Sequence, residues 1–223
     1  GNDLNIDNEK WFKVDETTTA LEIPFVIKSG ESGVESNLAN VDLAINGVPQ
    51  NVTINGSEAK GTITIQTSSV SLDGTTVSFK IKDAAGNSYE TEYKVKVDAK
   101  APVISTFTVG GNTSYSVPIS GNPVIAALVS DDISFETAEI TVQTPTGTES
   151  KTKSLLDNGS VEKLGIEINK SYTLSDIIGE EAKDGAYTVT LYLKDKAGHE
   201  VTKSISFTLD NTAPVVTADI SSG

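Results

Sequence analysis

Apolar and polar residues alternate along much of the chain. The alternation is clearest in four segments: residues 77–82, 93–97, 189–193 and 205–209. A period of two is typical of strands that bury one face and leave the other in water. In this pattern Lys96 and Tyr192 fall on the solvent side of their strands. Sheets with one wet face are antiparallel, so the pattern predicts antiparallel pairing.

Turn signals separate these strands. Asp83–Asn87 and Asp195–His199 each begin with Asp and carry Gly in fourth position, which predicts a hairpin turn. Asn46-Gly47 and Asn55-Gly56 mark further tight turns. The remaining strands are expected near residues 10–14, 20–28, 40–46, 48–54 and 60–67, and near 104–109, 122–129, 137–144, 148–154 and 166–173.

Two local features are expected in the second half of the chain. Residues 174–183 could form one or two helical turns with Ser175 as the N-cap. Tyr187 precedes an inward-facing strand position by two residues, which matches a tyrosine corner, in which the hydroxyl bonds to nearby backbone.

Part of the sequence occurs twice. Residues 76–104 and 188–216 align without a gap at an offset of 112 residues, and 10 of their 29 positions are identical. A period of this length is about the size of one small domain and too long for a solenoid repeat. The chain is therefore expected to be all-β, with two tandem immunoglobulin-like β-sandwiches of about seven antiparallel strands each.

The repeat places the domain boundaries. Residues 1–8 are expected to be an N-terminal tether, 9–98 the first sandwich and 99–103 a linker. Residues 104–210 are expected to form the second sandwich, and 211–223 a linker and the beginning of a further domain. Pro102 and Pro214 occupy equivalent positions in the two junctions, where proline stiffens the backbone.

The composition of the chain excludes several kinds of site and partner. The formal net charge is −14, and the 223 residues include neither cysteine nor arginine. Disulfides and cysteine metal sites are thereby excluded. An acidic chain without arginine is a poor nucleic-acid binder, so no nucleic-acid partner is expected. No stretch of 18 apolar residues occurs, so no membrane span is expected.

The repeated residues resemble bacterial Ig-like repeat domains, which occur in tandem in large surface and secreted proteins. The second copy carries the pattern at Asp184, Gly185, Tyr187, Asp195, Ala197, Gly198, His199, Asp210, Ala213 and Pro214. The first copy carries it at Asp73, Gly74, Asp83, Ala85, Gly86, Asn87, Asp98, Ala101 and Pro102, with Thr75 where the family has Tyr. His199 replaces the Asn that the family usually has after Gly. The resemblance implies an exported protein at the bacterial cell surface, with its anchor outside these residues.

Candidate catalytic residues are few. His199 is the only histidine and is interpreted as a turn residue. Ser, Asp and His can be combined on paper into a triad, but geometry defines a triad and nothing in the sequence sets that geometry. A pair of acids of the glycosidase kind would need a cleft, which a slender sandwich rarely offers. No catalytic residue, cofactor or enzymatic activity is expected.

A calcium-binding site is the most specific chemical hypothesis that the sequence offers. In an Ig-like second domain, the loops carrying Asp131, Asp132 and Asp195 lie at the end where the chain enters, and Asp98 of the linker approaches that end. Oxygen ligands from converging loops could hold Ca²⁺ and stiffen the joint. The alternative is that each Asp forms a turn by itself, as short Asp side chains often do.

Three functions from different classes remain open. The first is a non-enzymatic spacer or adhesion module of a bacterial surface or secreted protein, with further Ig-like domains of the same chain as neighbours. The second is a module of a surface lipoprotein that binds a host or cell-surface protein or glycan, for which an exposed aromatic platform is expected. Trp11 could stack on a sugar, or could instead be a core residue or cover an open sheet edge. The third is an accessory domain of an exported hydrolase.

Overall fold

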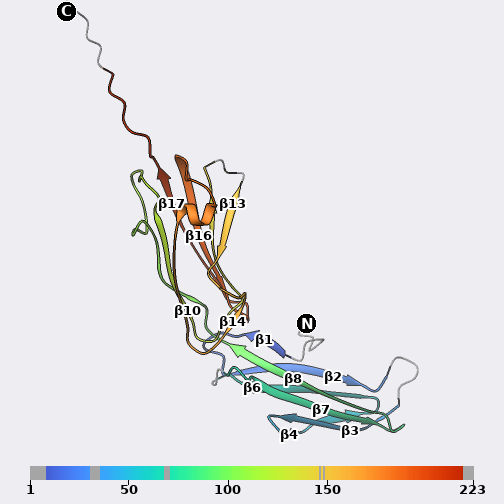
Figure 1. Cartoon of the computed structure of the whole chain (residues 1–223). Coiled ribbons are helices and arrows are strands. Elements are labelled where there is room, and N and C mark those ends of the chain that lie inside the picture. The colour runs from blue at the N-terminus through green and yellow to red at the C-terminus, as the bar shows by residue number, and fades with distance from the viewer. Residues whose placement is uncertain (1–8, 31–35, 68–70, 146, 148, 218–223) are drawn as a thin grey trace, which may run out of the picture. The chain divides into compact units, whose positions relative to one another are not determined.

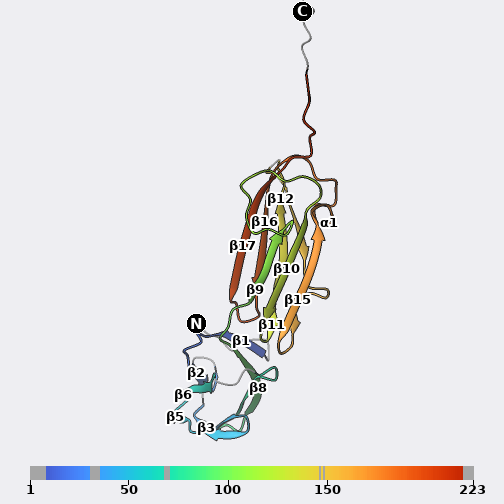
Figure 2. The same ribbon diagram turned by 90° about the vertical axis from the view of Figure 1, so that its left-hand side faces the viewer.

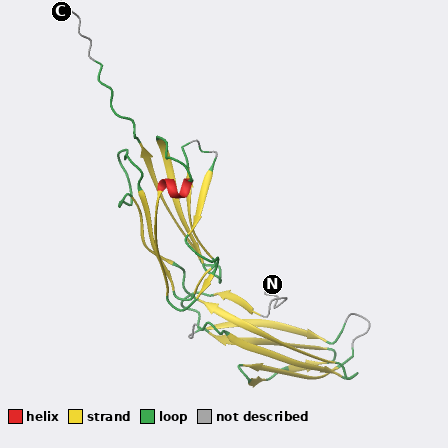
Figure 3. Cartoon of the chain, viewed as in Figure 1, coloured by secondary structure: helices red, strands yellow, loops and turns green. Residues whose placement is uncertain are grey.

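The computed structural model describes residues 9–30, 36–67, 71–145, 147 and 149–217 (Figure 1). The described chain divides into two compact units. Of the described residues, the first unit comprises 9–30, 36–67 and 71–101 with the short segments 162–164 and 196–199, and the second comprises the remainder. Strands make up nearly all of the regular structure in both units, and α1 (Leu174–Ile178) is the one helix of the described residues (Figure 3).

The first unit is a sandwich of two sheets. One sheet has the order β1-β8-β7-β3-β4 and the other has the order β2-β6-β5. The strands are β1 (Glu9–Lys13), β2 (Ala20–Lys28), β3 (Leu38–Ile45), β4 (Val48–Gln50), β5 (Thr53–Asn55), β6 (Glu58–Gln66), β7 (Thr75–Asp83) and β8 (Ser88–Asp98). All of these pair antiparallel except β1, which runs parallel to β8.

The second unit follows the same plan. A sheet of order β15-β10-β9 faces a sheet of order β13-β12-β16-β17, and β11 and β14 form a small additional pair. Figure 2 shows β9, β10 and β15 side by side, with β16 and β17 in the other layer. The strands are β9 (Val103–Val109), β10 (Val124–Asp131), β11 (Ser134–Phe135), β12 (Thr137–Gln143), β13 (Ser150–Ser154), β14 (Val161–Glu162), β15 (Ile166–Thr173), β16 (Gly185–Lys194) and β17 (Glu200–Leu209). Its strand order is that of an immunoglobulin-like sandwich, which confirms the predicted fold class.

Each unit buries its own core between its two sheets. In the first, Ile23 and Ile63 from one sheet and Val77 from the other are all 0% exposed. In the second, Ile125 lies in one sheet and Ile140 and Leu191 in the other, again at 0%. The alternating residues that predicted the strands are thus the residues that hold the layers together.

The predicted hairpin turns are present at the repeat positions. Asp83 Oδ1 accepts the Asn87 backbone N–H at 2.8 Å, and Asp83 Oδ2 accepts the Asn87 side-chain amide at 2.9 Å. The side-chain hydrogen bond from Asn87 leads the interactions that hold the Asp83 pKa below its usual value. Gly86 and Gly198 both have positive φ, at 95° and 97°, so each closes its turn in a conformation that suits glycine.

The tyrosine corner is also confirmed. Tyr187 is 2% exposed, and its hydroxyl donates to the Lys183 carbonyl at 2.9 Å and accepts the Lys183 N–H at 3.1 Å. Burial raises the pKa of Tyr187, although the Lys183 backbone hydrogen bond acts in the opposite direction. The ring stacks on Phe207 with centroids 5.4 Å apart, so one side chain joins the end of the core to the loop before β16.

Three sequence predictions are wrong in detail. The N-cap of α1 is Thr173 and not Ser175, because Thr173 and Asp176 form a reciprocal capping box. The strand expected at 48–54 is two strands, β4 and β5, which pair in different sheets. Lys96 does not lie in solvent but is 5% exposed, because β1 runs beside β8 and brings Glu9 within 3.0 Å of the Lys96 Nζ.

We expect Tyr187→Phe to lower the free energy of unfolding of the second unit by about 1–2 kcal/mol, because both hydrogen bonds to Lys183 are lost while the ring packing remains. Chemical denaturation, monitored by far-ultraviolet circular dichroism, measures the change in the free energy of unfolding. Tyr89→Phe is the control, since Tyr89 is 61% exposed. Equal stability of the two variants would contradict a structural role for the corner.

Candidate functional site

A parallel contact closes each sandwich at the same repeat position. In the first unit β1 pairs with β8 over five residues, with Phe12 opposite Val97. In the second unit Ile119 forms a parallel bridge with Leu209, the residue 112 positions after Val97. The Ile119 N–H donates to the Thr208 carbonyl and the Asp210 N–H to the Ile119 carbonyl, both at 2.9 Å. Each sandwich therefore ties an early segment to its last strand.

The acidic loops of the second unit centre on Asp131, at the end of β10. Its side chain is 5% exposed, and Oδ1 accepts the backbone N–H groups of Ile133 at 2.9 Å and Ser134 at 2.8 Å. Oδ2 is buried without a hydrogen-bond partner among the described residues. Burial raises the pKa of Asp131; the two backbone hydrogen bonds act against this, and the nearby carboxylates of Asp132 and Asp195 add to it.

The other predicted calcium ligands divide between the units. Asp132 and Asp195 belong to the second unit with Asp131, and Asp195 is 0% exposed. Asp98 ends β8 in the first unit, where its Oδ1 accepts the Lys100 N–H at 2.9 Å. Asp98 and Asp131 thus make the turn-type bonds of the alternative interpretation, and in the second unit the carboxylates of Asp132 and Asp195 lie close enough to Asp131 to raise its pKa.

His199 lies in the turn that the sequence predicted, between β16 and β17. It is 6% exposed, so it is a buried side chain and not an exposed residue at a hairpin tip.

The aromatic residues singled out in the sequence are largely covered. Trp11 lies in β1, opposite Lys96 of β8, and the Lys96 Nζ stands 5.2 Å from the centre of the Trp11 ring. This agrees with the interpretation of Trp11 as a cover on an open sheet edge. Tyr192 is half-buried and not fully in solvent. Tyr89, on β8, is the exposed tyrosine of the described part of the chain, at 61%.

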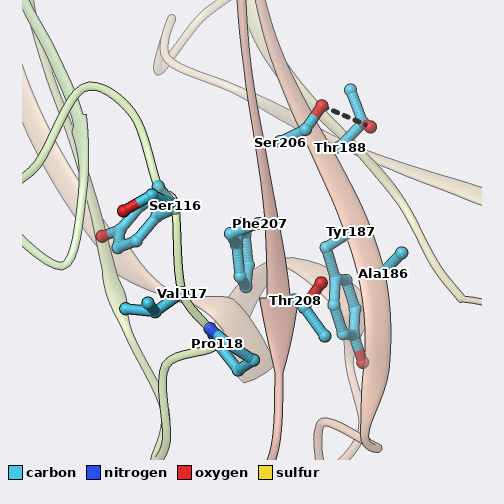
Figure 4. Close-up of a pocket in the computed structure, with 10 residues that line it drawn as sticks. Ser116, Val117, Pro118, Ala186, Tyr187, Thr188, Ser206, Phe207 and Thr208 are labelled. Atoms are coloured by element: carbon cyan, nitrogen blue, oxygen red, sulfur yellow. Dashed lines mark hydrogen bonds between the residues drawn. The ribbon is translucent and has the colours of Figure 1, made fainter.

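A groove of about 290 Å³ runs beside the edge strand β17 in the second unit. Figure 4 shows Ser116, Val117 and Pro118 on one side and Phe207 and Thr208 of β17 on the other. The complete lining is Tyr115, Ser116, Val117, Pro118, Ala186, Tyr187, Thr188, Ser206, Phe207 and Thr208. A second groove of about 300 Å³ lies in the first unit and includes Asn46, Gln66 and Val97. Neither of these two grooves is lined by a carboxylate or histidine.

Sequence reasoning missed a surface of hydroxyl groups on the outer side of the sheet β13-β12-β16-β17. Its side chains form three hydrogen-bonded pairs: Thr141–Thr152 at 2.9 Å, Thr188–Ser206 at 3.0 Å and Thr190–Ser204 at 2.8 Å. We call these six residues the hydroxyl face. Their alternation was visible in the sequence, but which residues meet across strands depends on the register, which the sequence did not provide.

Comparison with known proteins gives structural similarities alone. No model of a protein family matches the chain, and no curated protein matches it. A four-repeat segment from the extending region of a large adhesion protein is 20% identical, with 86% of this chain and 50% of that chain covered, at a TM-score of 0.34. A Ca²⁺-stabilised adhesin with which an Antarctic bacterium binds ice is 22% identical, with 91% and 47% covered, at a TM-score of 0.28.

Latent PorU from Porphyromonas gingivalis also matches, at 14% identity and a TM-score of 0.33, with 95% of this chain and 20% of that chain covered. The chain thus spans half or less of the length of these three proteins. The matches include adhesin repeats and Ig domains. At TM-scores of 0.34 and below they carry no argument about function. No helix in the described part of the chain is long and apolar enough to cross a membrane.

Proposed function

We propose that this chain is a non-enzymatic spacer that resists tension in an exported bacterial adhesin-like protein. The observation that carries the proposal is the parallel pairing of β1 with β8 in the first unit, which has a smaller counterpart in the single bridge between Ile119 and Leu209 of the second unit. A spacer that holds a distal adhesive part away from a cell must resist tension along the chain, and this contact lies in the path of that tension.

The direction of the strands decides how the load is shared. Tension enters the first unit through β1 and leaves it through β8, which ends at Asp98. Because β1 and β8 are parallel, the two pulls act in opposite directions along one common axis. The five paired residues are then loaded in shear and must yield together, whereas a pair pulled apart from one end would yield one bond at a time.

The connector between the sandwiches suits the same function. β8 ends at Asp98 and β9 begins at Val103, so four residues connect them. The Asp98 side chain accepts a hydrogen bond from the Lys100 N–H, and the ring of Pro102 restricts the backbone φ angle directly before β9. A short, locally ordered connector transmits tension with little slack.

We expect Val14→Pro to lower the unfolding force of the first unit, because the Val14 N–H donates to the Asp98 carbonyl at 3.0 Å next to the loaded strand pair. Removing one such bond costs about 1–3 kcal/mol. Single-molecule force spectroscopy on the full chain, held at its two ends, measures the force of each unfolding event.

The matched control is Thr53→Pro in the edge strand β5, which pairs with β6 outside the tension path. This variant should lose a similar amount of stability in denaturant while the unfolding force of the first unit stays close to that of the unchanged chain. If the two proline variants lowered the force equally, the shear-loaded contact would not be the mechanical element.

A second function, calcium binding by the second unit, is supported by the buried Asp131. Its Oδ2 lacks a hydrogen-bond partner among the described residues, and Asp132 and Asp195 add negative charge beside it. Burying like charges together is costly unless a cation or a proton offsets them. Carboxylate oxygens are the ligands that Ca²⁺ prefers, so we propose that Asp131 and Asp132 supply ligands to the ion and that the nearby charge of Asp195 adds to its attraction.

We expect Ca²⁺ to stabilise the second unit against heat and EDTA to reverse the effect, by about 1–3 kcal/mol at saturating metal. In Asp131→Asn the retained oxygen can still accept the Ile133 and Ser134 N–H groups, so folding in EDTA should persist while the gain from Ca²⁺ is lost. Calorimetry with and without Ca²⁺ measures both.

Asp157→Asn is the control for calcium binding. It removes the same charge from an exposed residue of the same unit and should keep the full gain. An unchanged melting temperature of the natural chain on addition of Ca²⁺ would end the calcium proposal without affecting the mechanical one.

A further inference from the structure

The hydroxyl face differs from the corresponding face of the first unit in its last strand, because Thr76 and Ser78 of β7 match Thr188 and Thr190 but the facing residues of β8 are charged. At the repeat offset of 112 residues, Ser204 and Ser206 correspond to Glu92 and Lys94. The outward positions 90, 92 and 94 of β8 are Glu or Lys, whereas the matching positions 202, 204 and 206 of β17 are Thr or Ser. The same strand in the same fold therefore presents ionic groups in one unit and neutral hydroxyls in the other.

Neutral hydroxyls are cheaper to remove from water than charges are, so this face can be covered by a partner at a lower cost than its counterpart on β8. The hydroxyls are also arranged in advance. A row across four strands joins Thr152, Thr141, Thr190 and Ser204. A hydroxyl has one donor and two acceptor sites, so each hydrogen-bonded pair still offers one O–H and three lone pairs to a ligand. A flat ligand with its own hydroxyls meets these groups without burying a charge.

The groove beside β17 extends this surface. Thr188 and Ser206 belong to both the hydroxyl face and the groove lining, so the two are continuous (Figure 4). Pro118 has no N–H, and the parallel contact with β17 is the single bridge at Ile119. The Thr208 carbonyl points to this edge, where it accepts the Ile119 N–H, and the backbone of Ser206 points to the same edge because strand groups alternate. The groove thus adds backbone groups to side-chain hydroxyls and the apolar Val117, which is 67% exposed.

We propose that the hydroxyl face and the adjoining groove form a binding site for a neutral polysaccharide. The site supplies many weak hydrogen-bonding groups and a shallow recess next to them, and one carboxylate, that of Glu139 on β12, lies beside it. An extended peptide adding to β17 is the competing occupant. Lys203 disfavours it, because a charged residue on the core side of an edge strand guards against strand addition, and Lys203 shares that side with Ile205 and Phe207. The site is independent of the spacer function, since a spacer needs no ligand.

The test is affinity electrophoresis of the full chain in native gels containing dextran, mannan or hydroxyethylcellulose. The proposal expects at least one of these neutral polysaccharides to retard the chain. Ser204→Glu/Ser206→Lys copies the residues that the first unit carries at these positions and leaves the net charge unchanged. It should weaken binding by about tenfold or more, since each lost set of hydrogen bonds is replaced by charges that resist desolvation.

Thr106→Glu/Ser171→Lys is the matched control, placed on the outer side of the sheet β15-β10-β9, and it should bind like the unchanged chain. Val117→Asp, in the groove loop, offers an independent variant that alters no strand and should also weaken binding. Melting temperatures show that each variant is folded. Absence of retardation by all three polysaccharides, equal retardation of Ser204→Glu/Ser206→Lys and the control, or binding of arrayed extended peptides in place of polysaccharides would overturn the proposal.

Discussion

Burial of alternate apolar side chains between two facing sheets is the constraint on which the rest of the structure depends. The chain contains no cysteine, so no disulfide can replace packing. Each unit has its own set of fully buried residues, such as Ile23 and Ile63 in the first and Ile140 and Leu191 in the second. The longer strands turn one face to the core, so their other face is left to solvent.

The repeat shows which features this constraint preserves and which it leaves to vary. The final hairpin, its Asp-initiated turn and the parallel contact at Val97 and Leu209 recur in both units. The outward faces of the last strands do not recur, since β8 is charged where β17 carries hydroxyls. A common core with different surfaces allows two sandwiches in one chain to share a fold and differ in the groups that they present to solvent.

Much of the fold followed from the sequence because strand periodicity and turn chemistry are local. The two hairpins, the turns at Asn46-Gly47 and Asn55-Gly56 and the corner at Tyr187 are all present. The errors arose where distant segments meet. Lys96 looked solvent-facing until β1 was placed beside β8, and the division of 48–54 depends on which sheet each half joins. The hydroxyl face was missed for the same reason, because only the cross-strand register brings Thr190 next to Ser204.

Native-state hydrogen exchange on the full chain carrying Leu191→Ala tests most directly whether each unit is held by its own core. The truncation removes a fully buried side chain from the second unit and costs about 2–5 kcal/mol. The amides of β10, β12 and β16 should lose protection by that amount while those of β2, β6 and β7 keep theirs. An equal loss of protection in β2, β6 and β7 would contradict the account, because one cooperative core would then span both halves of the chain.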